Sequence, residues 1–169
     1  KAVGAGSARA ESAGAKSAAA KSAAAKSAAA VRAGTPAAVV AARDTLRARG
    51  RAVMAEVLGE PYVARRDAST TAFNGPVRRL SEEFAYATLW TREGLSRRER
   101  SLVTIGMLCA LNRPHELRIH LAGAINNGCT ADEIREVFTH GVAYCGFPAA
   151  IDALRVAEEV LREHGLLAG

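Results

Sequence analysis

From Thr35 onward, the sequence carries repeated signals for the beginning and end of helices. Ser96 and Thr130 are each followed three residues later by a glutamate, which is the spacing of a capping box. Prolines suited to first helical turns stand at Pro36, Pro76, Pro114 and Pro148. No stretch alternates polar and apolar residues as a strand does, so we predict an all-α fold of about six helices. The expected helices cover 36–58, 76–90, 97–111, 114–126, 131–145 and 148–164, with Gly50 as a break in the first and a loop over 59–75.

The first 35 residues differ in composition from the rest of the chain. They are rich in alanine, glycine and serine, and they repeat K-S-A-A-A three times over 16–30. Such a composition is typical of a tether and not of a packed core. We therefore divide the chain into a low-complexity extension or linker, 1–35, and one helical domain, 36–169.

The formal charge of +6 is concentrated in the front part of the chain. Residues 1–50 contain nine Lys or Arg and two Asp or Glu, a net +7, whereas 51–169 carry a net −1. A nucleic-acid interface on the domain is therefore not expected. A binding module whose basic N-terminal tail contacts nucleic acid remains an alternative.

Three polar residues lie at helical spacing near the start of the expected helix 114–126. Glu116 and His120 are four residues apart, and Arg113 precedes Glu116 by three, so the three side chains fall on nearly one helix face. A carboxylate beside an imidazole raises its basicity, and a guanidinium binds a carboxylate through paired hydrogen bonds. The spacing alone favours a surface contact over a catalytic pair.

Three longer segments indicate the protein family more specifically than the spacing of these three residues does. They read SRRERSLVTI over 96–105, ALNRPHELRIHLAGAINNG over 110–128 and YCGFPAA over 144–150. In these segments, and over roughly 50–165, the chain resembles the carboxymuconolactone decarboxylase family, whose helical fold belongs to the alkylhydroperoxidase D-like superfamily. One departure is Thr88, which stands where the family pattern carries an acidic residue and leaves room for a related lactone substrate.

The resemblance implies a decarboxylase that needs neither a cofactor nor a metal. The expected reaction converts gamma-carboxymuconolactone to the 3-oxoadipate enol-lactone in protocatechuate breakdown, with the lactone itself accepting the electrons left by CO2. In this interpretation His120 is the general acid, Glu116 orients it and Arg113 binds a substrate carboxylate. The first alternative is a family member that acts on another lactone.

Three further residues are candidate substrate contacts. Arg100 is basic in a first helical turn, where acidic residues are usual, which favours a role in substrate binding or at an interface. His140 shares a face with Val137 and Tyr144, and it either lines the pocket or is a core histidine. Trp90 either forms a wall of the site or fills the core.

The three cysteines, Cys109, Cys129 and Cys145, form neither a disulfide framework nor a metal motif. The superfamily's redox centre is a C-x-x-C followed four residues later by a His. Aligning that His with His120 puts Arg113 and Glu116 at the cysteine positions, so this chain lacks the dithiol. We expect all three cysteines to be structural small hydrophobic residues.

The remaining expectations concern location and assembly. The scattered cysteines indicate a reducing compartment, and no apolar run reaches the ~20 residues of a membrane span, so we expect a cytoplasmic protein without a membrane partner. The resemblance implies a homo-oligomer, a trimer or a hexamer. It also suggests that 1–35 joins this domain to an enol-lactone hydrolase, as the C-terminal part of a fusion.

Overall fold

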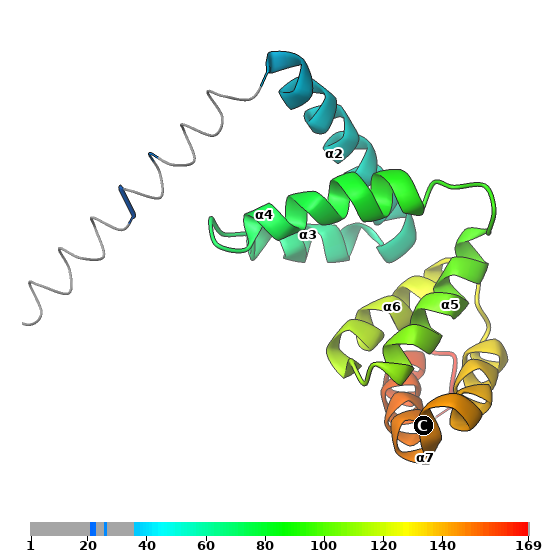
Figure 1. Cartoon of the computed structure of the whole chain (residues 1–169). Coiled ribbons are helices and arrows are strands. Elements are labelled where there is room, and N and C mark those ends of the chain that lie inside the picture. Colours follow the sequence, from blue (N-terminus) through cyan, green and yellow to red (C-terminus); the bar gives the residue numbers. More distant parts are fainter. Residues whose placement is uncertain (1–20, 23–25, 27–35, 169) are drawn as a thin grey trace, which may run out of the picture. The chain divides into compact units, whose positions relative to one another are not determined.

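The computed structural model describes residues 21–22, 26 and 36–168. The chain divides into two units, Lys1–Asp44 and Thr45–Gly169, and the features described below belong to the second unless stated. The described residues form helices joined by turns and contain no strand, which confirms the all-α prediction (Figure 1). None of the described helices is long and apolar enough to cross a membrane. Nearly all of the predicted extension lies outside the described residues, so its boundary stays a prediction.

The first long helix, α2, spans Ala37–Leu58 and continues through Gly50, so the predicted break there is wrong. Gly50 is buried, and a Cβ atom at this position would overlap the carbonyl oxygen of Glu82. The glycine costs some helix propensity, but it lets two helix backbones approach closely.

A short helix, α3 (Glu60–Ala68), replaces most of the loop predicted over 59–75. Gly59, at φ 87°, turns the chain out of α2, and Pro61 stands in the first turn of α3. The polar composition misled the prediction because Arg66, which reads as a loop residue, is buried beside Val63.

The predicted helix 76–90 consists of α4 (Gly75–Leu80) and a π-helix, η1 (Ser81–Leu89). The wider winding is visible at its end, where the Trp90 amide donates to the Ala85 carbonyl, five residues back, at 2.9 Å. Stretches of π-helix are rare and often occur at functional sites. This one buries Glu82 and Tyr86.

Three helices form the second half of the chain: α5 (Arg97–Ala110), α6 (Pro114–Asn126) and α7 (Ala131–Glu163). Both predicted capping boxes are present, at Ser96 for α5 and at Thr130 for α7. The predicted helices 131–145 and 148–164 are the two halves of α7, which is kinked at Gly146 (φ 82°).

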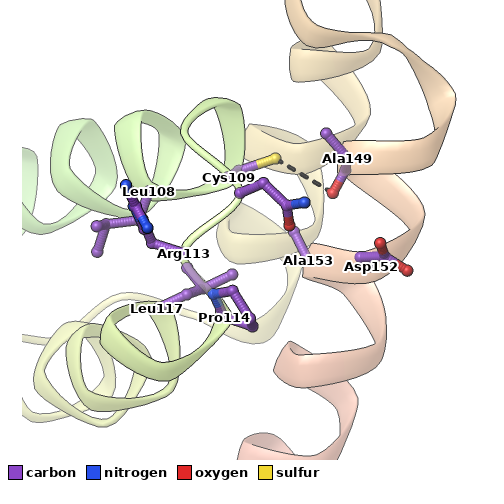
Figure 2. A pocket seen from close by; sticks show the side chains of 9 residues that line it. Leu108, Cys109, Arg113, Pro114, Leu117, Ala149, Asp152 and Ala153 are labelled. Atoms are coloured by element: carbon purple, nitrogen blue, oxygen red, sulfur yellow. Dashed lines mark hydrogen bonds between the residues drawn. The ribbon is translucent and has the colours of Figure 1, made fainter.

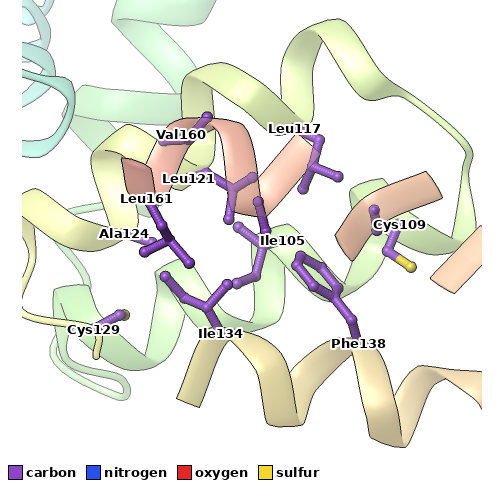
Figure 3. Packing of buried hydrophobic residues seen from close by; sticks show 12 residues of the cluster. Ile105, Cys109, Leu117, Leu121, Ala124, Cys129, Ile134, Phe138, Val160 and Leu161 are labelled. Carbon is purple, nitrogen blue, oxygen red and sulfur yellow. The ribbon is translucent and has the colours of Figure 1, made fainter. Parts of the chain in front are cut away.

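The main core lies between α5, α6 and α7 (Figure 3). Ile105, Leu121 and Phe138, one from each helix in chain order, are fully buried there. A second cluster joins the end of α2 to α3 and η1, and Ile119 of α6 packs against it. Helix α6 therefore contacts both clusters, which holds its remaining face in a defined orientation.

Candidate active site

Backbone hydrogen bonds hold Arg113 at the turn between α5 and α6. The Asn112 amide donates to the Cys109 carbonyl and the Arg113 amide to the Leu108 carbonyl, both at 3.0 Å. Asn112 adopts a left-handed conformation, φ 49°, which asparagine tolerates better than most residues. Arg113 occupies the N-cap position of α6, and Pro114 follows in the first turn, so the guanidinium projects from a well-defined point.

Glu116 and His120 follow Arg113 along α6. Glu116 is exposed and His120 is half-buried. Burial lowers the pKa of His120 below its ordinary value, and the negative charge of Glu116 partly opposes this shift. The two side chains therefore interact electrostatically, and no hydrogen bond joins them in the part of the chain that the structure describes.

Arg100 lies in the first turn of α5. Its guanidinium donates to the Arg92 carbonyl at 2.7 Å, and its own carbonyl accepts from the Thr104 hydroxyl. The Arg100 Nε atom is buried and has no hydrogen-bond partner among the described residues. A buried donor without a partner is costly, so this atom is a suitable contact for an anionic ligand.

Trp90 and His140 each have a different aromatic neighbour. Trp90 stacks on Tyr86 with ring centroids 6.1 Å apart, and it packs against the second cluster. His140 is exposed, with its ring centroid 5.1 Å from that of Tyr144, and it lines an open hollow of about 310 Å³. Arg113, Glu116 and His120 thus lie on α6 or at its start. The rings of Trp90 and His140 contact Tyr86 and Tyr144 instead.

An arginine-lined cavity of about 290 Å³ was not predicted from the sequence. Within this cavity a buried salt bridge links α3 to η1, with Arg66 Nη1 2.5 Å from Glu82 Oε1. Arg51 also donates a hydrogen bond to the Asp67 carboxylate at 2.8 Å. The hydrogen bond from Arg51 lowers the pKa of Asp67. In the sequence, only the adjacent arginines at 65–66 and 78–79 hint at this cavity. The ion pairs could not be predicted, because each arginine and its acidic partner lie far apart in the sequence.

A hollow of about 390 Å³ lies on another side of α6. Tyr62, Arg118 and His164 are among its lining residues. Arg118 donates to Glu159 at 2.9 Å and also pairs with Glu163. Because position 118 is two residues from both Glu116 and His120, its side chain does not share their helix face.

The cysteines only partly match the expectation of structural hydrophobic residues. Cys109 and Cys129 are buried as expected, whereas Cys145 is half-buried, and all three are free. The Sγ atoms of Cys109 and Cys145 lie 3.9 Å apart, a proximity that the sequence did not predict. Burial raises the pKa of the Cys109 thiol to about 11. No group of three or more His, Cys, Asp or Glu among the described residues is placed to hold a metal ion.

Comparison with known proteins decides the family. The sequence pattern of the carboxymuconolactone decarboxylase family matches residues 76–159. The chain is 43% identical over 118 residues to a 4-carboxymuconolactone decarboxylase of Acinetobacter baylyi, an alignment covering 70% of this chain and 88% of that protein. The chain belongs to the carboxymuconolactone decarboxylase family. The family match runs from the start of α4 well into α7, so Arg113, Glu116 and His120 lie inside it.

A second relative carries a different name within the same class of enzyme. The chain is 40% identical over 114 residues to a nitrosuccinic acid decarboxylase of Metarhizium robertsii, covering 68% of this chain and 80% of that protein. Proteins similar to this chain are therefore named for more than one decarboxylation substrate.

Proposed function

We propose that the protein is a carboxy-lyase that converts 4-carboxymuconolactone, also called gamma-carboxymuconolactone, to the 3-oxoadipate enol-lactone. The observation that carries this proposal is the 43% identity over 88% of a relative named for that substrate. The row Arg113, Glu116 and His120 supports it, because the row offers a carboxylate-binding group and a proton donor on one helix.

The substrate supplies its own electron sink. When the bond between the ring carbon and its carboxylate breaks, CO2 leaves and the electron pair moves through the ring double bond to the lactone carbonyl. A proton then adds to the carbon next to that carbonyl, which leaves the enol-lactone. The enzyme must stabilise the negative charge that develops on the carbonyl oxygen and deliver this proton.

His120 is the proposed proton donor. Burial makes its imidazolium a stronger acid than a solvated one, while the charge of Glu116 keeps a larger fraction of it protonated. Glu116 is thus a positioning and charge-balancing residue for His120. A general acid must be protonated when the carbanion forms, so the opposing charge of Glu116 favours the donor role of His120.

Arg113 and Arg100 are the proposed anion contacts. The substrate carries two carboxylates, and only one of them leaves as CO2. The retained carboxylate matches the guanidinium of Arg113. Arg100 lies at the opposite end of α5, and its proposed role as an anion contact is supported by its buried Nε, which has no partner among the described residues. Trp90 and His140 stay proposed substrate contacts. His140 lies on α7, which packs against α6, and Trp90 packs against the same cluster as Ile119 of α6. Both lie within the family match.

Nitrosuccinate is the second candidate substrate, favoured by the 40% identity to the fungal relative. Loss of CO2 from its nitro-bearing carbon leaves the electron pair on the nitro group, and protonation of that carbon gives 3-nitropropanoate. The same three groups of α6 would serve, because this substrate is also a dicarboxylate with an internal electron sink. Thr88, which departs from the family pattern, marks a position where specificity could differ.

The test is to incubate the protein separately with the lactone prepared from carboxymuconate and with nitrosuccinate. Released CO2 and the product are followed by NMR in D2O, where one deuterium should enter the carbon that receives the proton. Turnover of the lactone supports the first proposal, and turnover of nitrosuccinate alone supports the second. Absence of turnover with both contradicts the proposed function.

A homo-oligomer, trimer or hexamer, is the proposed assembly. Val103 and Met107 of α5 and Leu111 directly after it form an exposed row at intervals of four residues, and Met107 is 60% exposed. On α7, Tyr144 and Phe147 are also exposed, at 79% and 68%. Apolar patches of this kind on one chain are typical of protein interfaces. Three free cysteines support a reducing, cytoplasmic location.

The extension 1–35 is proposed as a linker, with fusion to an enol-lactone hydrolase as its context. The competing role, a basic tail that contacts nucleic acid, is tested by DNA retention at increasing salt. Retention that falls with salt and disappears when 1–35 is deleted would favour the nucleic-acid role.

A further inference from the structure

Two cysteines that are 36 residues apart in the sequence meet between α5 and α7. Cys109 stands in the last turn of α5, and Cys145 precedes the kink of α7. Their Sγ atoms are separated by 3.9 Å, which is contact distance for two sulfurs. Each thiol also lies near a carbonyl. Cys145 donates to the Gly141 carbonyl at 3.1 Å. The Cys109 sulfur is 3.6 Å from the Ala149 oxygen (Figure 2).

The surroundings allow the two sulfurs to come closer. Gly141 has no side chain, and a Cβ atom there would lie 3.6 Å from the Cys145 sulfur and 4.0 Å from the Cys109 sulfur. Gly146, at φ 82°, follows Cys145 directly and interrupts the regular winding of α7. A disulfide requires the sulfurs to approach to about 2.0 Å. Rotation of the cysteine side chains beside a glycine, next to a helix kink, is a suitable way to achieve this.

We propose that Cys109 and Cys145 form an intramolecular disulfide when the protein meets a peroxide, so that this pair is a redox modification site. Cys129 takes no part, because its sulfur contacts the Arg98 carbonyl at 3.6 Å and it is buried elsewhere in the core.

The reaction balances with hydrogen peroxide as the oxidant. Cys145, the more accessible thiol, attacks one peroxide oxygen as its thiolate; the O–O bond breaks, water is released and a sulfenic acid remains. The Cys109 sulfur then attacks the Cys145 sulfur, the S–O bond breaks, and the leaving hydroxide takes up the Cys109 proton as water. Two thiols are oxidised by two electrons in total, and one peroxide is reduced to two waters.

The disulfide would act on the turn that carries Arg113. The Cys109 carbonyl accepts the Asn112 amide, and Cys109 shares the lining of a small hollow with Arg113 and Asp152 (Figure 2). A covalent link from the end of α5 to the kink of α7 would therefore restrain the α5–α6 turn. Because the link limits the unfolded chain, we expect the oxidised protein to melt at a higher temperature than the reduced protein.

The experiment is peptide mapping of the full-length protein after peroxide treatment. Free thiols are alkylated under denaturing conditions, and the protein is digested with trypsin. Cleavage after Arg118 and Arg135 puts the three cysteines on separate peptides, 101–118, 119–135 and 136–155; the first runs to Arg118 because trypsin does not cut before Pro114. We expect a linked pair of 101–118 with 136–155, two hydrogen atoms lighter than the two reduced peptides, and alkylation of Cys129 alone. Dithiothreitol should restore all three free thiols.

Two variants serve as matched controls. Cys129→Ser should keep the linked pair, whereas Cys145→Ser should abolish it and leave Cys109 open to alkylation; Cys145→Ala repeats this test if the serine variant does not fold. The proposal is overturned if all three thiols stay free, if Cys145 is found as a sulfinic acid beside a free Cys109, or if the link joins Cys129 or two chains. None of these readouts depends on decarboxylase activity, so the proposed function is tested separately.

Discussion

At the scale of single residues, His120 determines how the proposed site works. Its half-buried ring has a lowered pKa, because burial disfavours the imidazolium, and the nearby Glu116 carboxylate acts in the opposite direction. The balance between these two effects sets how much proton donor is present at a given pH. Glutamine at position 116 removes the negative charge without changing the length of the side chain.

Glu116→Gln removes the charge and keeps the shape. We expect the pKa of His120 to fall further, because only the lowering effect of burial remains. The measurement is an NMR titration of the imidazole signals in the wild type and the variant, with His115→Ala used to assign the neighbouring ring. An unchanged or higher His120 pKa in Glu116→Gln would show that the two groups do not interact as described.

The lowered pKa of His120 also has a consequence for stability. Between the folded pKa and the unfolded value of about 6.5, the unfolded chain binds more protons at this residue than the folded protein does. The stability that His120 contributes is therefore fully present above pH 6.5 and is lost as the pH falls. Compared with His120→Gln, the wild type should lose more free energy of unfolding between pH 7.5 and pH 5. Urea unfolding at several pH values measures this difference, and parallel curves for the two proteins would contradict it.

At the scale of secondary-structure elements, close backbone approaches decide the fold around the second cluster. Gly50 lets α2 contact η1 at Glu82, and Gly123 lets α6 approach the end of α2 near Leu58. Side-chain amides add to the second contact, since Asn126 donates to the Glu56 carbonyl at 2.6 Å. The elements are thus joined at points where a methyl group does not fit.

Gly50→Ala is expected to destabilise the protein, although alanine is the better helix former. The added Cβ would overlap the Glu82 carbonyl, and overpacking of this kind costs about 1–3 kcal/mol or more. Gly94→Ala is the matched control, because a Cβ there meets nothing within 4 Å. Denaturant midpoints measure both variants. A Gly50→Ala protein as stable as Gly94→Ala would contradict the close approach.

The helix starts were predictable from the sequence, whereas two features of the first half were not. Ser96 and Thr130 signal their helices locally, since each cap and its glutamate lie within four residues. Helix α3 was missed because the burial of Arg66 depends on Glu82, sixteen residues away. The π-helix was missed because its hydrophobic pattern does not differ visibly from that of an α-helix over nine residues.

The candidate site, like the fold, was predictable only in part from the sequence. The row on α6 follows from helical spacing and the family resemblance, and the structure keeps Arg113, Glu116 and His120 on one helix. The burial that shifts the His120 pKa depends on tertiary packing and could not be read from the sequence. The same is true of the contact between Cys109 and Cys145, which lie on different helices.

At the scale of the whole molecule, the exposed apolar rows of α5 and α7 are the basis for the proposed assembly. Met107→Glu places a charge in the middle of the α5 row, so we expect it to shift the protein towards smaller species. Ala52→Glu, at an exposed position of α2, is the control. Light scattering coupled to size-exclusion chromatography measures the mass of each. A monomeric wild type, or a Met107→Glu protein of unchanged mass, would contradict the use of this row as an interface.

The proposed mechanism requires that His120 donate a proton to carbon after CO2 leaves the lactone. The direct measurement is the rate of CO2 release and enol-lactone formation by the wild type, His120→Ala and the matched variant His115→Ala, which replaces an exposed histidine on the same helix. We predict turnover by the wild type and by His115→Ala, and a kcat lower by roughly 10²–10⁴-fold in a folded His120→Ala. Wild-type turnover by His120→Ala would contradict the role of His120 as proton donor, and no turnover of the lactone by the wild type would contradict the proposed decarboxylation.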